Sequence, residues 1–380
     1  MRRNTLFWIS SLLGALPALP APAQDVLVLR AGKILVAPGK VLPRGTMVVR
    51  EGKVFALGRD LATPAGAKEL DFPTAVVVPG WVDSWTQATS AGETQELSTA
   101  WTPEIRAADA LDLESPLWER FARWGVTSVV VTPDPAQVGG GLACLVKTGR
   151  KARLVEKALF LQFSLTSRAR NRERPPTSLA GQVALIRRNF RKAPKEGPLA
   201  RALSGKLPAL FACRTPAEVQ AALRLAAEFH LPKVLLEAPQ VCRPLPSLLE
   251  GSGVGLILTP PGKEAPPWSL GIPAALAGKG LPFAFASACP SYPPVELRLL
   301  PAPARRRGLD PVRALAAVTV TPARLLDLSW RIGSLRLGRD ADFLVLDGPP
   351  AHPGSRILSV FVEGRPVWTA PAGAAKESPK

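Results

Sequence analysis

Acidic side chains beside two apolar stretches are the first groups in this sequence that could do chemistry. Asp83 follows the apolar run 75–78, and Glu93 and Glu96 come shortly after it. Glu237 lies near the end of another apolar run. A pair of carboxyl groups can catalyse acid–base hydrolysis without a metal. Asp83 and Glu237 are therefore candidate catalytic residues, and the alternative is that Asp83 stabilises a strand end by hydrogen bonding.

The four cysteines offer a second kind of chemistry. Cys213, Cys242 and Cys289 fall at the ends of predicted strands, where a thiolate could bind a metal or act as a nucleophile. Together with Cys144 they show no C-x-x-C spacing, so the zinc-ribbon and thioredoxin patterns are absent from the sequence. Packing as buried thiols and disulfide pairing are the simpler interpretations, and the sequence does not assign a pairing.

Two other features could suggest a site. The chain has only two histidines, His230 at the end of a predicted surface helix and His352 in a loop, and neither is expected to bind a ligand. The segment 137–149, QVGGGLACLVKTG, contains three consecutive glycines, but no G-K-[ST] follows at the spacing of a phosphate-binding loop. We expect this segment to make a tight turn.

The elements that must position these side chains alternate between apolar strands and helices. Helices are predicted over 215–229 and 310–328, with Thr215 and Asp310 as N-caps. Fully apolar strands separated by helices indicate a parallel sheet that is covered on both faces. An α/β fold with a closed (β/α)8 TIM-like barrel is favoured, and a doubly wound open sheet is the alternative. The predicted strands are 75–81, 127–133, 158–165, 207–213, 232–239, 254–261 and 281–289.

Both ends of the mature chain follow a different pattern. Residues 25–58 and 333–368 alternate apolar and polar side chains between glycines and prolines, which is typical of short antiparallel strands. We expect the two ends to meet in one small sheet domain.

The formal net charge of +18 raises the question of a nucleic-acid partner. The basic clusters 168–176, 187–195 and 304–308 fall in predicted helices or loops, and Phe190 is their only aromatic residue. Nucleic-acid binding usually needs stacking aromatics or a known module, so no nucleic-acid partner is expected. A solvated basic surface is the simpler interpretation, and binding to an anionic surface stays open.

The N-terminus predicts export. A basic MRRN segment, an apolar stretch and the small residues of Ala21-Pro22-Ala23 are typical of a secretory signal peptide over residues 1–23, cleaved after Ala23. The apolar stretch is shorter than the roughly 20 residues that span a bilayer, so no transmembrane anchor is expected after cleavage. The mature protein is predicted to be periplasmic or secreted.

Four segments carry a resemblance to a known family. GTMVVREGKVFALG, VVVPGWVDS, TPARLLDLSWRIGSLRLGRDADFLVLDG and VFVEGRPVW resemble the amidohydrolase superfamily, and its imidazolonepropionase-like branch in particular. The resemblance implies a (β/α)8 barrel with a composite β-sandwich built from both termini. It places the sandwich in residues 24–78 and 329–380 and the barrel in 79–328.

The family's chemistry is C–N bond hydrolysis by water that is activated on one or two divalent metals, usually zinc. The ligand positions that the resemblance implies are occupied here by Trp85, Gln87, Phe211, Ala238 and Ala288, although a register one or two places away is compatible at Ala238. None of these side chains is a good metal ligand. We therefore predict that the metal is absent, and that Trp85 and Phe211 fill its volume.

Three hypotheses about function follow. The first is a catalytically inactive pseudo-hydrolase that binds a ligand or a partner, such as an active amidohydrolase relative or a second copy of the chain. The second is an active hydrolase of C–N bonds that uses a rebuilt carboxylate or thiolate site. The third is a surface protein that binds polyanions.

Overall fold

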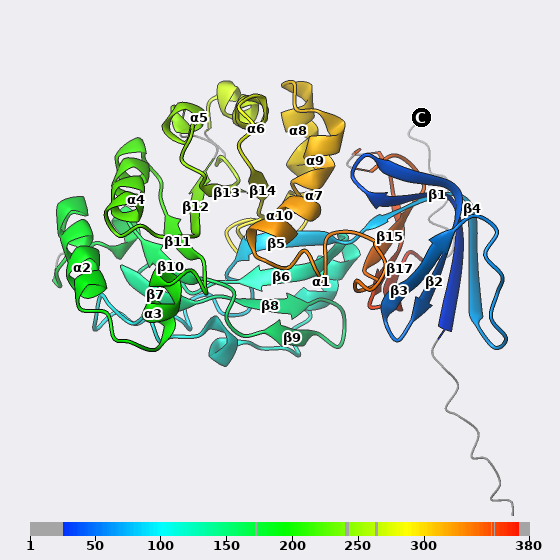
Figure 1. Cartoon of the computed structure of the whole chain (residues 1–380), viewed down its shortest axis with the longest axis horizontal. Helices are drawn as coiled ribbons and strands as arrows, with labels where there is room; N and C mark the ends of the chain where they lie inside the picture. Colours follow the sequence, from blue (N-terminus) through cyan, green and yellow to red (C-terminus); the bar gives the residue numbers. More distant parts are fainter. Residues whose placement is uncertain are drawn as a thin grey trace, which may run out of the picture.

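The computed structural model describes residues 26–371, except 172, 240–242, 263–264, 351 and 353. The predicted signal peptide and Cys242 therefore lie outside the described residues. The described strands form three sheets of seven, six and four strands. Figure 1 shows the seven-stranded sheet at one end of the molecule and the parallel strands with their helices at the other.

The seven-stranded sheet joins the two ends of the chain, as predicted. Its central strand β4 pairs in parallel with β1 and antiparallel with β15, where Val76 lies opposite Leu346. These strands are hydrogen bonded as one sheet, so the composite sandwich and the exact domain limits stay predictions. In sheet order the strands are β17 (Arg365–Thr369), β16 (Ile357–Val362), β15 (Phe343–Leu346), β4 (Lys68–Pro79), β1 (Val26–Ala37), β2 (Lys40–Arg50) and β3 (Lys53–Gly58).

The other two sheets contain six of the apolar strands predicted in the middle of the chain. The seventh, 75–81, is wrong as one strand, because its apolar run ends β4 of the seven-stranded sheet and β5 begins only at Trp81. The five strands from β10 to β14 run parallel to one another, as do β5 and β6. The six-stranded sheet contains β14 (Phe283–Phe285), β13 (Gly255–Thr259), β12 (Val234–Pro239), β11 (Ala209–Ala212), β10 (Leu161–Ser164) and β7 (Gly139–Leu142). The four-stranded sheet contains β5 (Trp81–Thr86), β6 (Val126–Val131), β8 (Cys144–Lys147) and β9 (Arg153–Glu156).

Helices connect these strands and lie along their outer side (Figure 1). Thr215 caps α4 in a capping box with Glu218, and the Asp310 side chain accepts hydrogen bonds from Val312 N and Arg313 N, so both predicted N-caps are confirmed. None of the helices among residues 26–371 that the structure describes is long and apolar enough to cross a membrane. The helices are α1 (Leu117–Arg123), α2 (Leu179–Arg191), α3 (Pro198–Leu203), α4 (Pro216–Glu228), α5 (Leu245–Leu248), α6 (Ile272–Gly278), α7 (Glu296–Leu299), α8 (Pro301–Arg306), α9 (Pro311–Ala316) and α10 (Val320–Leu325), with 3-10 turns η1 (Ala107–Ala110), η2 (Ser167–Ala169) and η3 (Pro267–Gly271).

The single helix predicted over 310–328 is wrong, because the chain breaks between α9 and α10. At the break, the Ala317 carbonyl accepts from Phe285 N in β14 and the Val318 carbonyl accepts from Val82 N in β5. Because these carbonyls accept hydrogen bonds from the strands, they are not available as acceptors within a continuous helix. The break therefore bridges the two strands at the edges of different sheets.

The strands have a TIM-barrel-like arrangement, but the described strands are hydrogen bonded as two sheets and not as one closed ring. β5 and β14 lie side by side, and the Ser84 hydroxyl donates to the Phe285 carbonyl over 2.8 Å. No ladder joins these two strands among the residues described, because the α9–α10 junction takes up their free backbone groups.

The glycine-rich segment 137–149 is not the tight turn that the sequence suggested. It forms β7, antiparallel to β10, and β8, antiparallel to β6. Glycine is required here by close contact, since a Cβ atom on Gly139 would lie 2.6 Å from the Trp101 ring. A Cβ atom on Gly141, whose φ is +102°, would lie 2.2 Å from the Ile105 carbonyl oxygen. The glycines thus let the loop 99–106 pack directly against a strand.

A buried ion cluster holds the seven-stranded sheet against the strands of the barrel-like part. Lys147, on β8, is only 2% exposed and contacts the carboxylates of both Asp340 and Asp342, just before β15. Asp340 is also paired with Arg331 at 2.7 Å and with Lys53 at 3.3 Å. Burial works against the charged form of Asp340, but Lys147 and Arg331 outweigh it and hold its pKa below the usual value. Burial raises the pKa of Asp342, with Lys147 opposing.

Candidate functional site

Strand alternation decides which side chains face the interior of the barrel-like part. Leu210, Leu235 and Ile257 pack in one cluster with Trp85, and this cluster is the interior. Their neighbours in sequence belong to the layer between strands and helices. Phe211 stacks on Phe163 with ring centroids 5.2 Å apart, facing α2.

The predicted position of Phe211 in the metal volume is therefore wrong, and Ala238 also faces outward, in the same outer layer. Because side chains alternate along a strand, a register error of one residue moves a side chain to the other face. The inward-facing neighbours are Ala212 on β11 and Glu237 on β12. The sequence is compatible with a ligand position on β12 that lies one or two residues from Ala238. A shift of one residue places Glu237 at this position, on the inner face.

A pocket of about 500 Å³ opens at the carboxyl ends of the strands. Three of the positions that the sequence singled out line it: Trp85 and Gln87 after β5, and Ala288 after β14. We call it the mouth pocket. Among the residues that share its wall are Thr166, Arg168, Arg214, Thr259, Ser291 and Tyr292.

Trp85 and Gln87 are held differently in the mouth pocket. The Trp85 indole N–H donates to Gln162 Oε1 over 3.2 Å, so the ring is fixed and only 4% exposed. The Gln87 side chain is 7% exposed, and its Nε2 atom is buried without a hydrogen-bond partner among the residues described. A buried amide donor without a partner is costly, so Gln87 offers the pocket a hydrogen bond for a bound molecule.

Glu237 lies under the mouth pocket in a closed network. Its carboxylate is fully buried and accepts from Arg214 Nη1 at 2.5 Å and from the Thr259 hydroxyl at 2.8 Å. Burial disfavours the charged Arg214 guanidinium, but the Glu237 carboxylate outweighs this and raises the pKa of Arg214. Arg168 is likewise paired, with the buried Asp134 at 2.7 Å. Each arginine at the mouth therefore has its own carboxylate partner.

Asp83 is fully buried, and it does not line the mouth pocket. Its Oδ1 atom accepts from Ser287 N over 2.9 Å, which agrees with the structural role that the sequence allowed. The Oδ2 atom has no hydrogen-bond partner among the residues described. Burial raises the pKa of Asp83 to about 7, against the usual 3.8. Such a carboxyl can hold a proton near neutral pH, although it does not line the pocket.

The remaining candidate residues do not join this site. Glu93 and Glu96 lie outside the lining of the mouth pocket, and Glu96 accepts hydrogen bonds from Ser98. His230 follows α4, and His352 accepts from Gly354 N in an exposed loop. Neither histidine lies at the pocket.

The thiols are buried in apolar surroundings. Cys144 and Cys289 form no disulfide with another described cysteine, and burial raises the pKa of both thiols to about 12. Cys213 is buried in the outer layer and its thiol lies 3.8 Å from the Phe211 carbonyl oxygen. Protonated, buried thiols are poor nucleophiles and poor ligands, so a thiolate site at Cys144 or Cys289 is disfavoured.

Comparison with known proteins agrees with this architecture. Residues 293–369 match the model of the amidohydrolase family, and this stretch contains most of the C-terminal motif singled out in the sequence. The imidazolonepropionase of Symbiobacterium thermophilum is 24% identical, covering 89% of this chain and 96% of its own length. The amidohydrolase tasK of Hapsidospora irregularis is also 24% identical, and this chain spans only 35% of its length. An amidohydrolase from Thermotoga maritima has the same fold, with a TM-score of 0.81, 23% identity, and coverage of 90% of this chain and 100% of its own.

The C-terminal part of this chain, residues 293–369, matches the amidohydrolase family, and the chain resembles an amidohydrolase in fold.

The donor set at the mouth pocket does not fit a divalent metal. The mouth pocket presents an indole, a neutral amide and a methyl group at Trp85, Gln87 and Ala288. The nearby carboxylate of Glu237 is already bound by a guanidinium and a hydroxyl. Among the residues that the structure describes, no group of three His, Cys, Asp or Glu side chains could hold a metal ion. The predicted absence of zinc itself stays a prediction.

Sequence reasoning missed two arginines that line the mouth pocket. Arg168 belongs to a basic cluster interpreted as solvated surface, and Arg214 follows Cys213 directly at the end of β11. A charged residue just after a parallel strand of a barrel-like fold points to the mouth, and this signal could have identified Arg214.

Proposed function

We propose that this protein is an exported member of the amidohydrolase family that binds a small molecule in its mouth pocket without metal-dependent hydrolysis. One observation supports it most: the ligand-equivalent side chains of Trp85, Gln87 and Ala288 line an open pocket of about 500 Å³. A pocket of this size is large enough for a small ligand. Arg214 also lines the pocket, and the Glu237 carboxylate holds its guanidinium in place.

The chemistry of the wall indicates a carbonyl-bearing ligand. Gln87 offers a buried amide donor that has no partner among the described residues, and Trp85 offers an aromatic surface. Ser291 and Tyr292 add hydroxyl groups that can donate or accept. An amide or cyclic amide presents an oxygen acceptor beside a small planar body, which matches these groups. This is also the kind of bond that the family hydrolyses.

Metal content is the first test. The full chain, purified from cells supplemented with zinc and manganese, is expected to carry less than about a tenth of a metal equivalent, because no suitable ligand set is present. An active family member prepared in the same way is the control, and elemental analysis is the measurement. About one equivalent per chain would contradict the proposal and direct mutagenesis to the carboxylates at the mouth.

Ligand binding is the second test, with hydantoin as the probe. Calorimetry is expected to show binding without turnover. Replacing Gln87 by leucine is expected to weaken binding roughly threefold to tenfold, because one hydrogen bond is lost. Gln220→Leu, at an exposed position of α4, is the matched control. Equal affinities for the two variants would remove Gln87 from the binding site.

A second candidate function is hydrolysis by a rebuilt carboxylate site, which the pKa of about 7 at Asp83 favours. It requires turnover that survives a chelator and is lost in Asp83→Asn. We rank it second because Asp83 is buried and does not line the pocket.

The proposal also includes a partner, either an active relative or a second copy of the chain. Analytical ultracentrifugation of the mature chain, alone and mixed with an active family member, tests this part separately.

A further inference from the structure

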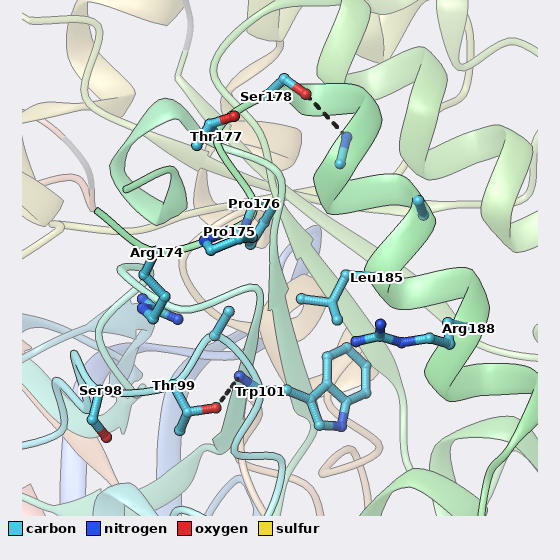
Figure 2. A pocket seen from close by; sticks show the side chains of 13 residues that line it. Ser98, Thr99, Trp101, Arg174, Pro175, Pro176, Thr177, Ser178, Leu185 and Arg188 are labelled. Carbon is cyan, nitrogen blue, oxygen red and sulfur yellow. Dashed lines mark hydrogen bonds between the residues drawn. The ribbon is translucent and has the colours of Figure 1, made fainter. Parts of the chain in front are cut away.

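A second pocket, of about 580 Å³, lies apart from the mouth pocket and shares no lining residue with it. We call it the α2 pocket. Its wall is made of the segment 98–101, the segment 174–178 and one face of α2, which contributes Leu185 and Arg188 (Figure 2).

The α2 pocket is positively charged. Arg174 and Arg188 line it, and none of the described residues that line it is acidic. The Nε and Nη1 atoms of Arg174 are buried without a hydrogen-bond partner in the part of the chain that the structure describes. Leaving guanidinium N–H groups buried and unsatisfied is costly, and a bound anion removes that cost. Hydrogen bonds from Ser98 lower the pKa of Glu96 and the charge of Arg174 adds to this, but the Glu96 side chain is exposed and accepts a hydrogen bond from the Ser98 hydroxyl.

The α2 pocket also has a rigid aromatic wall. Trp101 packs so closely on Gly139 that a Cβ atom there would overlap its ring, and its ring centroid lies 5.9 Å from that of Phe163. Its backbone N–H donates to the Thr99 hydroxyl over 3.3 Å. In Figure 2 the Trp101 ring lies beside Leu185 and Arg188, with Arg174 across the pocket. An apolar surface therefore adjoins the Arg188 guanidinium, and the Arg174 guanidinium lines the opposite wall of the same pocket.

We propose that the α2 pocket binds a small organic anion in which a carboxylate adjoins a planar apolar group, such as an aromatic carboxylate. The carboxylate pairs with Arg174 and Arg188, and the planar group packs on Trp101 and Leu185. Arginine suits this role, because its planar fork matches a carboxylate. The site is independent of the proposed function of the mouth pocket.

Calorimetric titration with phenylacetate tests this proposal, with phenylacetamide and acetate as comparison ligands. Phenylacetate is expected to bind at least about tenfold more tightly than either, since only it has both the charge and the ring. Arg174→Gln and Arg188→Gln are each expected to weaken phenylacetate binding by about tenfold or more. Arg224→Gln, at an exposed position of α4, removes the same charge elsewhere and is expected to leave binding unchanged.

Two results would overturn the proposal. If Arg224→Gln weakens binding as much as Arg174→Gln, the net charge attracts the anion and the α2 pocket does not. If phenylacetamide binds as well as phenylacetate, the guanidinium groups play no part. Thermal melting of every variant verifies folding, and Gln87→Leu, which alters only the mouth pocket, is expected to bind phenylacetate normally. A failure here therefore leaves the mouth proposal standing.

Discussion

Replacement of Lys147 by methionine is expected to lower the free energy of unfolding by about 3–5 kcal/mol at pH 8. Lys147 is the buried cation between Asp340 and Asp342, and methionine retains its volume without its charge. Asp342 would then stay buried without a countercharge, because the Glu363 N–H that it also accepts from is neutral. Urea unfolding of the full mature chain measures the loss.

Lys53→Met is the matched control for this prediction. Lys53 pairs with the same Asp340 at 3.3 Å, but its side chain is 51% exposed. An exposed pair contributes little, so this variant is expected to lose less than about 1 kcal/mol. If both variants lose the same amount, burial does not govern the strength of this cluster.

Replacement of Asp83 by asparagine is expected to change how stability depends on pH. The pKa of Asp83 is about 7 in the folded protein, against 3.8 ordinarily. Between these values the folded state keeps a proton that the unfolded state has lost. Stability of the native protein therefore falls as pH rises from about 4 to about 7, by a few kcal/mol. Asparagine has no such proton and retains the acceptor for Ser287 N.

Asp83→Asn is therefore expected to gain roughly 2–4 kcal/mol relative to the native protein between pH 4 and pH 8. Urea unfolding at both pH values measures this difference. Asp71→Asn, at an exposed position of β4, serves as the control and is expected to leave the pH dependence unchanged. A parallel pH dependence for Asp83→Asn and the native protein would mean that Asp83 ionises normally.

The strands and the N-caps were predictable because their signals are local. Apolar runs bounded by turns predicted β6 and β10–β14, and Thr215 with Glu218 three residues later is a capping box that the sequence shows directly. The junction between α9 and α10 was not predictable, because its carbonyls bind strands that lie far away in the sequence. The same holds for β7, where three glycines suit a turn as well as a strand under Trp101.

The candidate site was predictable only in part, for two physical reasons. The motif around Asp83 correctly predicted that Trp85 and Gln87 lie at the mouth pocket. The position of Ala288 just after β14 did the same for Ala288. On β11 and β12 the apolar runs are uniform, so composition cannot tell an inward from an outward side chain, and the assignment slipped by one residue. The ion pairs Arg214–Glu237 and Arg168–Asp134 depend on three-dimensional proximity alone.

The pairing of β4 with β15 constrains the order in which the molecule can fold. β1 to β4 are synthesised first, but one edge of β4 stays open until residues 343–346 emerge to cover it. An open strand edge rich in valine can pair with other chains. Completion of the sheet requires contacts between residues at opposite ends of the chain, which slows folding. Nascent chains that stop short of β15 should thus aggregate more readily than the full-length protein.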